Sequence, residues 1–168
     1  MSKILVTGGA GYIGSHMVLQ LLEDDQDYQV YVLDDLSNGS IDNLSFIERR
    51  GYSDRFELIN GNFGDADLLK QIFSEHEFLA VMHFAAFIQV GESVTNPAKY
   101  YHNNFSNAIT LLNEMGQAGI KNLIFSSTAA IFGNPDSKDV PLLSSAPKKP
   151  INSYGDSKLK VEQALPFF

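Results

Sequence analysis

Cysteine is absent from this chain of 168 residues, and so is tryptophan. Without cysteine there can be no disulfide, no thiolate metal ligand and no cysteine nucleophile, and the composition suits a reducing compartment. Basic residues are few, since 12 Lys and Arg face 20 Asp and Glu and the net charge is −8. This charge balance disfavours nucleic acids and anionic membrane surfaces. We therefore expect neither as a partner.

Long apolar runs are also lacking. No segment approaches the length that crosses a bilayer, and the apolar residues between Met1 and Thr7 are too few for a signal peptide. We therefore expect a cytoplasmic protein. The four histidines, His16, His76, His83 and His102, lie on separate predicted elements without the spacing of metal ligands, so we expect no metal site.

Strand and helix patterns alternate along the chain, which predicts a doubly wound parallel sheet of the Rossmann type in the α/β class. Apolar runs predict strands over residues 3–7, 29–33, 56–60, 79–84 and 122–126. Helical spacing predicts helices over 12–23, 65–74, 97–117 and 153–165. Residues 133–150 hold four of the six prolines and are predicted to form a surface loop. We see no internal domain boundary.

A glycine-rich loop lies between the first predicted strand and the first predicted helix. Gly9–Gly14 has the pattern G-x-G-x-x-G, and Thr7 and Gly8 precede it. Glycine lets the backbone turn tightly and approach a pyrophosphate, and the helix N-terminus offers free N–H groups to an anion. This context predicts a dinucleotide site.

Asp34 ends the second predicted strand, twenty residues beyond Gly14. A carboxylate at this place accepts hydrogen bonds from ribose hydroxyls and repels a 2′-phosphate. No arginine occurs nearby before Arg49, so the sequence favours NAD over NADP.

A tyrosine and a lysine are spaced for proton transfer near the other end of the chain. Tyr154 and Lys158 are four residues apart and share one helix face. A free tyrosine has a pKa of about 10, and a nearby ammonium favours its phenolate, which then acts as a base. Ser126, Ser127 and Thr128 follow the fifth strand, where a hydroxyl can orient a reacting oxygen. We expect a polar strand end at Ser127 and the active hydroxyl at Thr128.

Together these motifs resemble the extended short-chain dehydrogenase/reductases. The resemblance rests on the glycine loop and Asp34, and on His83-Phe84-Ala85-Ala86, Asn104, Ser126-Ser127-Thr128 and Tyr154-x-x-x-Lys158. Val90–Val94 and Ser157–Gln163 narrow it to the UDP-glucose 4-epimerases, also called UDP-galactose 4-epimerases. The similarity covers essentially all of this chain and the N-terminal part of the family's longer chain.

The resemblance implies the roles of the catalytic residues. Tyr154 would take the proton from the sugar 4-hydroxyl of a UDP-sugar, with Lys158 lowering its pKa and holding the nicotinamide ribose. Thr128 would share the hydrogen bond to that hydroxyl, and tightly bound NAD would take hydride from C4 and return it to the other face. The implied NAD contacts are Gly8, Gly11, Tyr12, Ile13, Gly14, Asp34, Asp35, Leu36, Ser37, Asn38, Gly39, Asn62, Phe63, Phe84, Ala85, Ala86, Phe87, Ile88, Asn104, Ser126, Tyr154 and Lys158.

The sequence also departs from the family pattern. Asn62 stands where the family has Asp, and Ile88 stands where it often has Lys. By resemblance, residues 1–168 form an incomplete NAD-binding Rossmann domain, cut after the fifth strand and part of the next helix. The resemblance implies that the sixth strand and the C-terminal substrate domain are not part of these residues, so the fifth strand is expected at an open edge. The family's homodimer would use the helices at 97–117 and 153–165.

Other functions remain open. A nucleotide-sugar 4,6-dehydratase would carry Asp-Glu directly after Thr128, where this chain has Ala129 and Ala130. Another NAD-dependent nucleotide-sugar epimerase or reductase is harder to separate, because most sugar contacts belong to the C-terminal part. The chain could also be an NAD-binding fragment or an interaction module without catalysis. We predict that it binds NAD and that its epimerisation is weak or absent.

Overall fold

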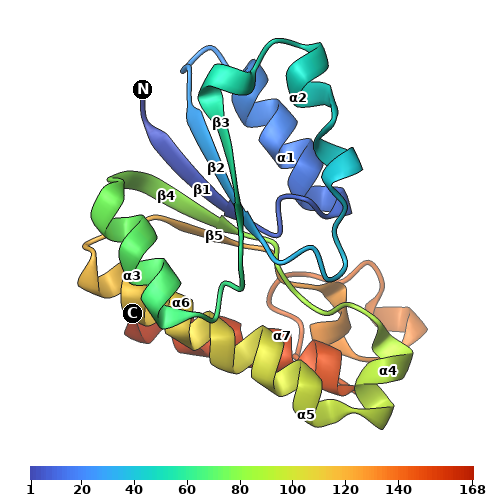
Figure 1. Ribbon diagram of the computed structural model, residues 1–168. Coiled ribbons are helices and arrows are strands. Elements are labelled where there is room, and N and C mark those ends of the chain that lie inside the picture. Colours follow the sequence, from blue (N-terminus) through green and yellow to red (C-terminus); the bar gives the residue numbers. More distant parts are fainter. The chain divides into compact units, whose positions relative to one another are not determined.

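The computed structural model describes residues 1–168, with the side chains of Glu48 and Asp139 left out of the description. The chain divides into two compact units (Figure 1). The first unit comprises Met1–Ala86 and Thr110–Ser126, and the second comprises Phe87–Ile109 and Ser127–Phe168.

The first unit contains a five-stranded sheet in the order β3-β2-β1-β4-β5, and every pairing is parallel. This order and direction confirm the predicted Rossmann-type fold. Each strand end lies within one residue of its predicted position. The strands are β1 (Lys3–Thr7), β2 (Gln29–Asp34), β3 (Phe56–Asn60), β4 (Phe78–His83) and β5 (Leu123–Phe125).

Both faces of the central strands are buried, as helices on two sides of a sheet require. Leu5 packs in one apolar cluster and its neighbours Ile4 and Val6 in another, because successive strand residues point to opposite faces. Helices α1 (Tyr12–Glu23) and α2 (Phe46–Arg49) supply the cluster of Ile4 and Val6. Figure 1 shows these two helices on the same side of the sheet.

The opposite cluster is closed by α3 (Ala66–Glu75) and by Leu111 and Met115 of α6 (Asn107–Gln117). Strand β5 is the last strand in the sheet order, and its Ile124 is 51% exposed. The edge position predicted for the fifth strand is therefore confirmed. Two short 3₁₀ turns complete this unit, η1 (Ile41–Leu44) and η2 (Ser53–Arg55).

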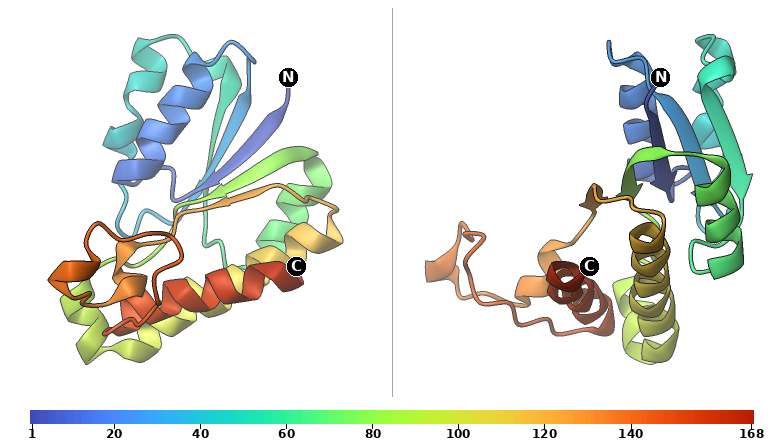
Figure 2. Two further views of the ribbon diagram at one scale, coloured as in Figure 1. Left: turned by 180° about the vertical axis from the view of Figure 1, so that it is seen from behind. Right: turned by 90° about the vertical axis from the view of Figure 1, so that its left-hand side faces the viewer.

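The second unit is helical. The helix predicted over 97–117 is present, but it is formed by α5 (Pro97–Tyr100), a π-helical segment η3 (Tyr101–Ser106) and α6, which belongs to the first unit from Thr110 onward. The predicted last helix is α7 (Ser153–Ala164), and Figure 2 shows η3 and α7 side by side. Helix α4 (Val90–Thr95) and the turns η4 (Ala129–Phe132) and η6 (Leu165–Phe167) were not predicted from the sequence.

The segment 133–150 is a loop, as predicted, with one short turn, η5 (Ser137–Asp139). In the part of the chain that the structure describes, no helix is long and apolar enough to cross a membrane. Among the side chains described, no three or more His, Asp or Glu residues gather where they could hold a metal ion.

Candidate functional site

The glycine loop of the first unit joins β1 to α1 and is shaped by contacts that exclude side chains. Gly8 has φ +73°, and a Cβ there would lie 2.5 Å from the Ala85 nitrogen. A Cβ on Gly14 would lie 2.1 Å from the Gly8 carbonyl oxygen. Glycine is therefore required at both positions. Gly8 allows the turn, and Gly14 allows the helix to pack closely on the loop.

Gly11 differs from these two glycines. It is the N-cap of α1 with an ordinary negative φ of −78°, and a Cβ there would meet only the Gly8 oxygen, at 3.2 Å. The following residues Tyr12 and Ile13 are 81% and 59% exposed, and the first turn contains no acidic residue. The helix N-terminus is thus uncovered by a capping side chain and carries no negative charge, which fits a pyrophosphate.

Asp34 is buried at the end of β2, where its carboxylate joins two parts of the predicted cofactor site. One oxygen accepts the Ala10 N–H at 2.9 Å and the other accepts the Leu36 N–H at 2.9 Å. A carboxylate offers about four acceptor positions, so two remain for ribose hydroxyls. The turn that follows is open, since Asp35, Ser37 and Asn38 are all exposed. This geometry fits the adenosine end of NAD.

Asn62 and Phe63 are committed to contacts within the first unit. The Asn62 side chain accepts the Gly64 N–H at 2.7 Å and donates to Asp35 at 3.2 Å. The Phe63 ring is buried in the core, 4.8 Å from the ring of His83. The His83 ring in turn pairs with the Thr7 hydroxyl at 2.5 Å, which gives this histidine a structural role.

Ala85 and Phe84 continue this packing after β4. Both of their backbone N–H groups donate to the carbonyl oxygen of Thr7, at 3.1 and 2.9 Å. Ser126 makes the corresponding bond from the end of β5, donating its N–H to the His83 carbonyl at 3.1 Å. These predicted cofactor residues therefore lie at the carboxyl ends of β4 and β5, where ligands bind parallel sheets.

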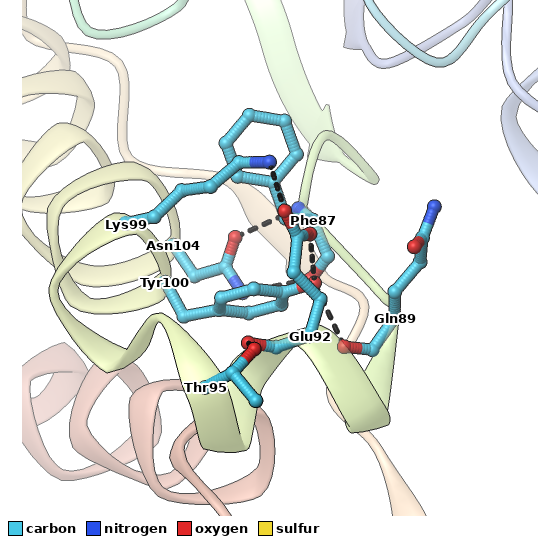
Figure 3. A network of polar contacts seen from close by, with 7 residues as sticks. All are labelled: Phe87, Gln89, Glu92, Thr95, Lys99, Tyr100 and Asn104. Atoms are coloured by element: carbon cyan, nitrogen blue, oxygen red, sulfur yellow. Dashed lines mark hydrogen bonds and ion pairs between the residues drawn. The ribbon is translucent and has the colours of Figure 1, made fainter.

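In the second unit, buried side chains hold the turn Phe87–Gln89. Asn104 is 1% exposed, and its amide accepts the Phe87 N–H at 2.8 Å and donates to the Phe87 carbonyl at 2.9 Å. The Tyr100 hydroxyl lies 2.8 Å from the Gln89 carbonyl oxygen (Figure 3). Ile88 lies between these fixed neighbours and is 64% exposed.

Charged groups support this turn. Glu92 binds the Lys99 ammonium at 2.6 Å and the Tyr100 hydroxyl at 2.9 Å, as Figure 3 shows. The bonds from Lys99 and then Tyr100 lower the pKa of Glu92. Burial, followed by the bond to Glu92, raises the pKa of Tyr100 to about 12, so this hydroxyl remains a donor at neutral pH. The Lys99 ammonium also lies 4.5 Å from the Phe87 ring centroid.

Helix α7 carries the predicted catalytic pair. Asn152 caps it by accepting the Gly155 N–H at 2.8 Å, which begins the helix just before Tyr154. Tyr154 is half-buried and Lys158 is 3% exposed. Burial lowers the pKa of Lys158 to about 8, so its ammonium still predominates at neutral pH. Lys158 thus places a cation on the same helix face as Tyr154.

The segment Ser127–Ala130 runs alongside α7. At one end the Ser127 hydroxyl donates to the carboxylate of Glu162, and at the other Ala130 packs so closely that a Cβ on Gly155 would lie 2.6 Å from its carbonyl oxygen. Thr128 lies between these contacts and caps η4 by accepting the Ala130 N–H at 3.2 Å. The second unit therefore brings Thr128 beside the stretch of α7 that bears Tyr154 and Lys158.

Sequence reasoning missed several residues of this arrangement. Asn152 was detectable as an N-cap before the last helix, and Glu162 as the next residue on the face of Tyr154 and Lys158. The close approach at Gly155 had no sequence signal, because it depends on a segment more than twenty residues away.

A hollow of about 730 Å³ lies elsewhere in the second unit, in the loop after η4. Phe132, Leu142 and Ile151 are among its lining residues, while Thr128, Tyr154 and Lys158 are not. We place the candidate site by its chemistry, at α7, rather than by the size of this hollow.

Known proteins resemble almost the whole chain. Residues 5–165 match the family model described as GDP-mannose 4,6 dehydratase. The UDP-glucose 4-epimerase of Azospirillum brasilense is 45% identical over 163 residues, which are 97% of this chain and 43% of that protein. The putative UDP-arabinose 4-epimerase 2 of Arabidopsis thaliana is 43% identical over 166 residues, which are 98% of this chain and 39% of that protein.

Solved structures also match almost the whole chain. The UDP-Glc/GlcNAc 4-epimerase of Campylobacter jejuni matches with a TM-score of 0.88 and 42% identity, over 99% of this chain and 49% of that one. The UDP-glucose 4-epimerase of Bifidobacterium longum, solved with NAD⁺ and UDP, matches with a TM-score of 0.90 and 36% identity, over 99% and 48%. The chain thus spans less than half the length of these relatives. It belongs to the family described as GDP-mannose 4,6 dehydratase, and it is similar to the N-terminal part of NAD-dependent UDP-sugar 4-epimerases.

Proposed function

We propose that this chain provides the NAD-binding and proton-transferring part of a 4-epimerase that interconverts UDP-glucose and UDP-galactose. The observation that carries the proposal is the grouping of Thr128, Tyr154 and the buried Lys158 along α7. A tyrosine base with a lysine beside it suits a reaction in which a proton leaves a hydroxyl oxygen and a hydride leaves the carbon that bears this hydroxyl.

The cofactor proposal rests on the first unit. Gly11 and the first turn of α1 would hold the pyrophosphate, and Asp34 with the turn after it would hold the adenosine ribose. Bound NAD would supply the hydride acceptor and donor for the sugar C4. Asp34 also supports the glycine loop through Ala10, so its replacement would alter the loop as well as the ribose contact.

The chain's own residues would move and hold the proton. The Tyr154 phenolate would accept it from the sugar 4-hydroxyl and return it after the sugar presents its other face. Lys158 would hold the nicotinamide ribose and place a cation on the same helix face as Tyr154. The Thr128 oxygen already accepts the Ala130 N–H, so its own proton can point toward the substrate oxygen. The chain lacks the two carboxylates that a dehydratase would carry after Thr128, because Ala129 and Ala130 stand there.

The identity of the sugar in the UDP-sugar substrate is a separate part of this proposal. Relatives named UDP-glucose 4-epimerase and UDP-arabinose 4-epimerase match to similar extents, at 45% and 43% identity. UDP-arabinose is therefore the second candidate substrate. The predicted homodimer through the helices at 97–117 and 153–165 stays a prediction, as does the cytoplasmic location.

The first experiment is calorimetric titration of the 168-residue chain with NAD, alongside Asp34→Ala and Tyr154→Phe. We expect binding that falls with Asp34→Ala and is kept by Tyr154→Phe. A folded chain that does not bind NAD would contradict the cofactor proposal.

The second experiment follows conversion of UDP-galactose and, separately, UDP-arabinose by ¹H NMR in the presence of NAD. Product that forms with the parent chain and not with Tyr154→Phe supports the catalytic proposal and identifies the sugar. NAD binding without product from either sugar would favour a cofactor-binding fragment instead.

A further inference from the structure

Three side chains meet beside α7, outside the predicted catalytic set. Ser127 donates its hydroxyl to one carboxylate oxygen of Glu162, and the Lys148 ammonium binds the other. Ser127 comes from the stretch after β5, Lys148 from the loop and Glu162 from α7. This cluster, which we call the Glu162 anchor, joins three segments that are distant in sequence.

The register of α7 connects this anchor to the catalytic residues. Tyr154, Lys158 and Glu162 follow one another at intervals of four residues and therefore share one face of the helix. Ser127 directly precedes Thr128 in the chain. The Glu162 anchor therefore fixes one end of the Thr128 segment, while the contact between Ala130 and Gly155 fixes its other end near Tyr154.

The chemistry of the anchor gives it one preferred arrangement. A carboxylate only accepts hydrogen bonds, so the Ser127 hydroxyl must donate to Glu162 and cannot turn elsewhere without losing that bond. Burial tends to raise the pKa of Glu162, but the hydrogen bonds from Lys148 and Ser127 outweigh it and lower that pKa. Glu162 is therefore ionised at neutral pH, with both oxygens engaged.

We propose that Glu162 is a positioning residue that acts through Ser127 to set where the Thr128 hydroxyl lies relative to Tyr154 and Lys158. The role in catalysis rests on the proposed function, because it matters only if Thr128 contacts the substrate. Displacement of a positioned group by about 1 Å can lower the reaction rate about a hundredfold. Because the anchor holds the residue next to Thr128, its loss can displace the Thr128 hydroxyl and lower the rate.

The test uses the methyl resonance of Thr128 in the 168-residue chain labelled at its four threonine methyl groups. Thr128→Ser identifies the signal by its loss. We expect Glu162→Gln to move the Thr128 methyl resonance by more than its linewidth. In a Ser127→Ala background, the same substitution should move it no further, because the link between them is already removed.

Asp156→Asn is the matched control. It also removes a charge from α7, but Asp156 pairs with Tyr101 and Lys160 rather than with the Thr128 segment. It should leave the Thr128 resonance in place. If Glu162→Gln does not fold, Glu162→Asp keeps the charge, shortens the side chain by one methylene and should also move the Thr128 resonance by more than its linewidth.

Two results would overturn the proposal. One is a Thr128 resonance that stays in place in a folded Glu162→Gln or Glu162→Asp chain. The other is an equal movement in the Ser127→Ala background, which would mean that Glu162 does not act through Ser127. Neither measurement needs cofactor or turnover. A failure of the epimerase proposal can therefore be distinguished from a failure of the proposed positioning role of Glu162.

Where turnover is measurable, the same variants give a kinetic readout. We expect Glu162→Gln to lower kcat about tenfold with KM unchanged. The double variant with Ser127→Ala and Glu162→Gln should have the same kcat as Glu162→Gln alone. A higher KM at unchanged kcat would contradict a role in positioning the reacting groups.

Discussion

The glycine loop of the first unit and helix α7 of the second unit achieve precision by opposite means. In the loop, the absence of side chains lets Gly8 approach Ala85 and lets Gly14 approach Gly8. Around α7, hydrogen-bonded side chains such as Asn152 and Glu162 hold the segments in place. A site made of backbone should therefore fail when atoms are added, and a site made of side chains should fail when atoms are removed.

The largest expected effect comes from adding one methyl group to the loop. Gly8→Ala should lower the free energy of unfolding by about 3–5 kcal/mol, from left-handed backbone strain and collision with the Ala85 backbone. Urea denaturation measures it. Gly51→Ala is the matched control, since Gly51 has φ +76° but open space around it, and it should cost only the strain of about 1–2 kcal/mol. Equal losses in both variants would contradict the collision.

Removing the Asn104 amide tests the second unit. Asn104→Ala leaves the partly buried N–H and carbonyl of Phe87 without these partners and should lower the free energy of unfolding by about 3 kcal/mol. Asn113→Ala, at an exposed position of α6, should change it by less than about 0.5 kcal/mol. If both substitutions cost the same, Asn104 does not hold the turn.

Burial of Lys158 predicts a pH-dependent stability. Its pKa is about 8 in the folded chain against an ordinary 10.5, so the unfolded chain binds more protons between these pH values. Stability therefore rises with pH in that window. Lys158→Met removes this titrating group. As pH rises through the window, the free energy of unfolding of wild type should increase relative to that of Lys158→Met by up to about 3 kcal/mol.

Denaturation curves at several pH values from 7 to 10 measure this difference. Lys160→Met removes a lysine that is 43% exposed on the same helix and should keep the wild-type profile. A difference between wild type and Lys158→Met that is constant with pH would show that the ammonium carries no burial penalty.

The smallest expected effect concerns cofactor affinity. Gly11→Ala adds a methyl group at the N-cap of α1 with only one moderate internal contact, so the fold should tolerate it. NAD affinity should nevertheless fall about tenfold, or about 1.4 kcal/mol, because the methyl group obstructs the pyrophosphate. Gly116→Ala, which meets nothing within 4 Å, is the matched control for calorimetry. Unchanged affinity in Gly11→Ala would remove the N-terminus of α1 from the cofactor site.

Much of the fold was predictable from local pattern. The bounds of β1, β3 and α1 match their predictions, because apolar periodicity and glycine punctuation act over a few residues. The helix α4 was missed because its six residues contain Gly91 and two valines, a poor helical pattern. The π-helical segment η3 within the long helix also left no local sign.

The candidate site divides in the same way. Gly8, Gly14, Asp34, Tyr154 and Lys158 were identifiable because backbone freedom, charge and spacing are properties of the sequence itself. Their predicted contacts with NAD and substrate stay predictions. Asn62 forms hydrogen bonds with Gly64 and Asp35, and Asn104 forms them with Phe87. These bonds were not predictable, because they depend on which groups the folded chain brings within bonding distance.

By itself, the sequence determined the residue types that carry the chemistry and the order of strands and helices, since both follow from local composition and spacing. Only the tertiary structure decided that Lys158 is buried, that Ser127 meets Glu162 and that Ala130 packs against Gly155. The physical reason is that burial and hydrogen bonding are relations between distant segments. The cost of burying the ammonium and the direction of a serine hydroxyl exist only once those segments have packed together.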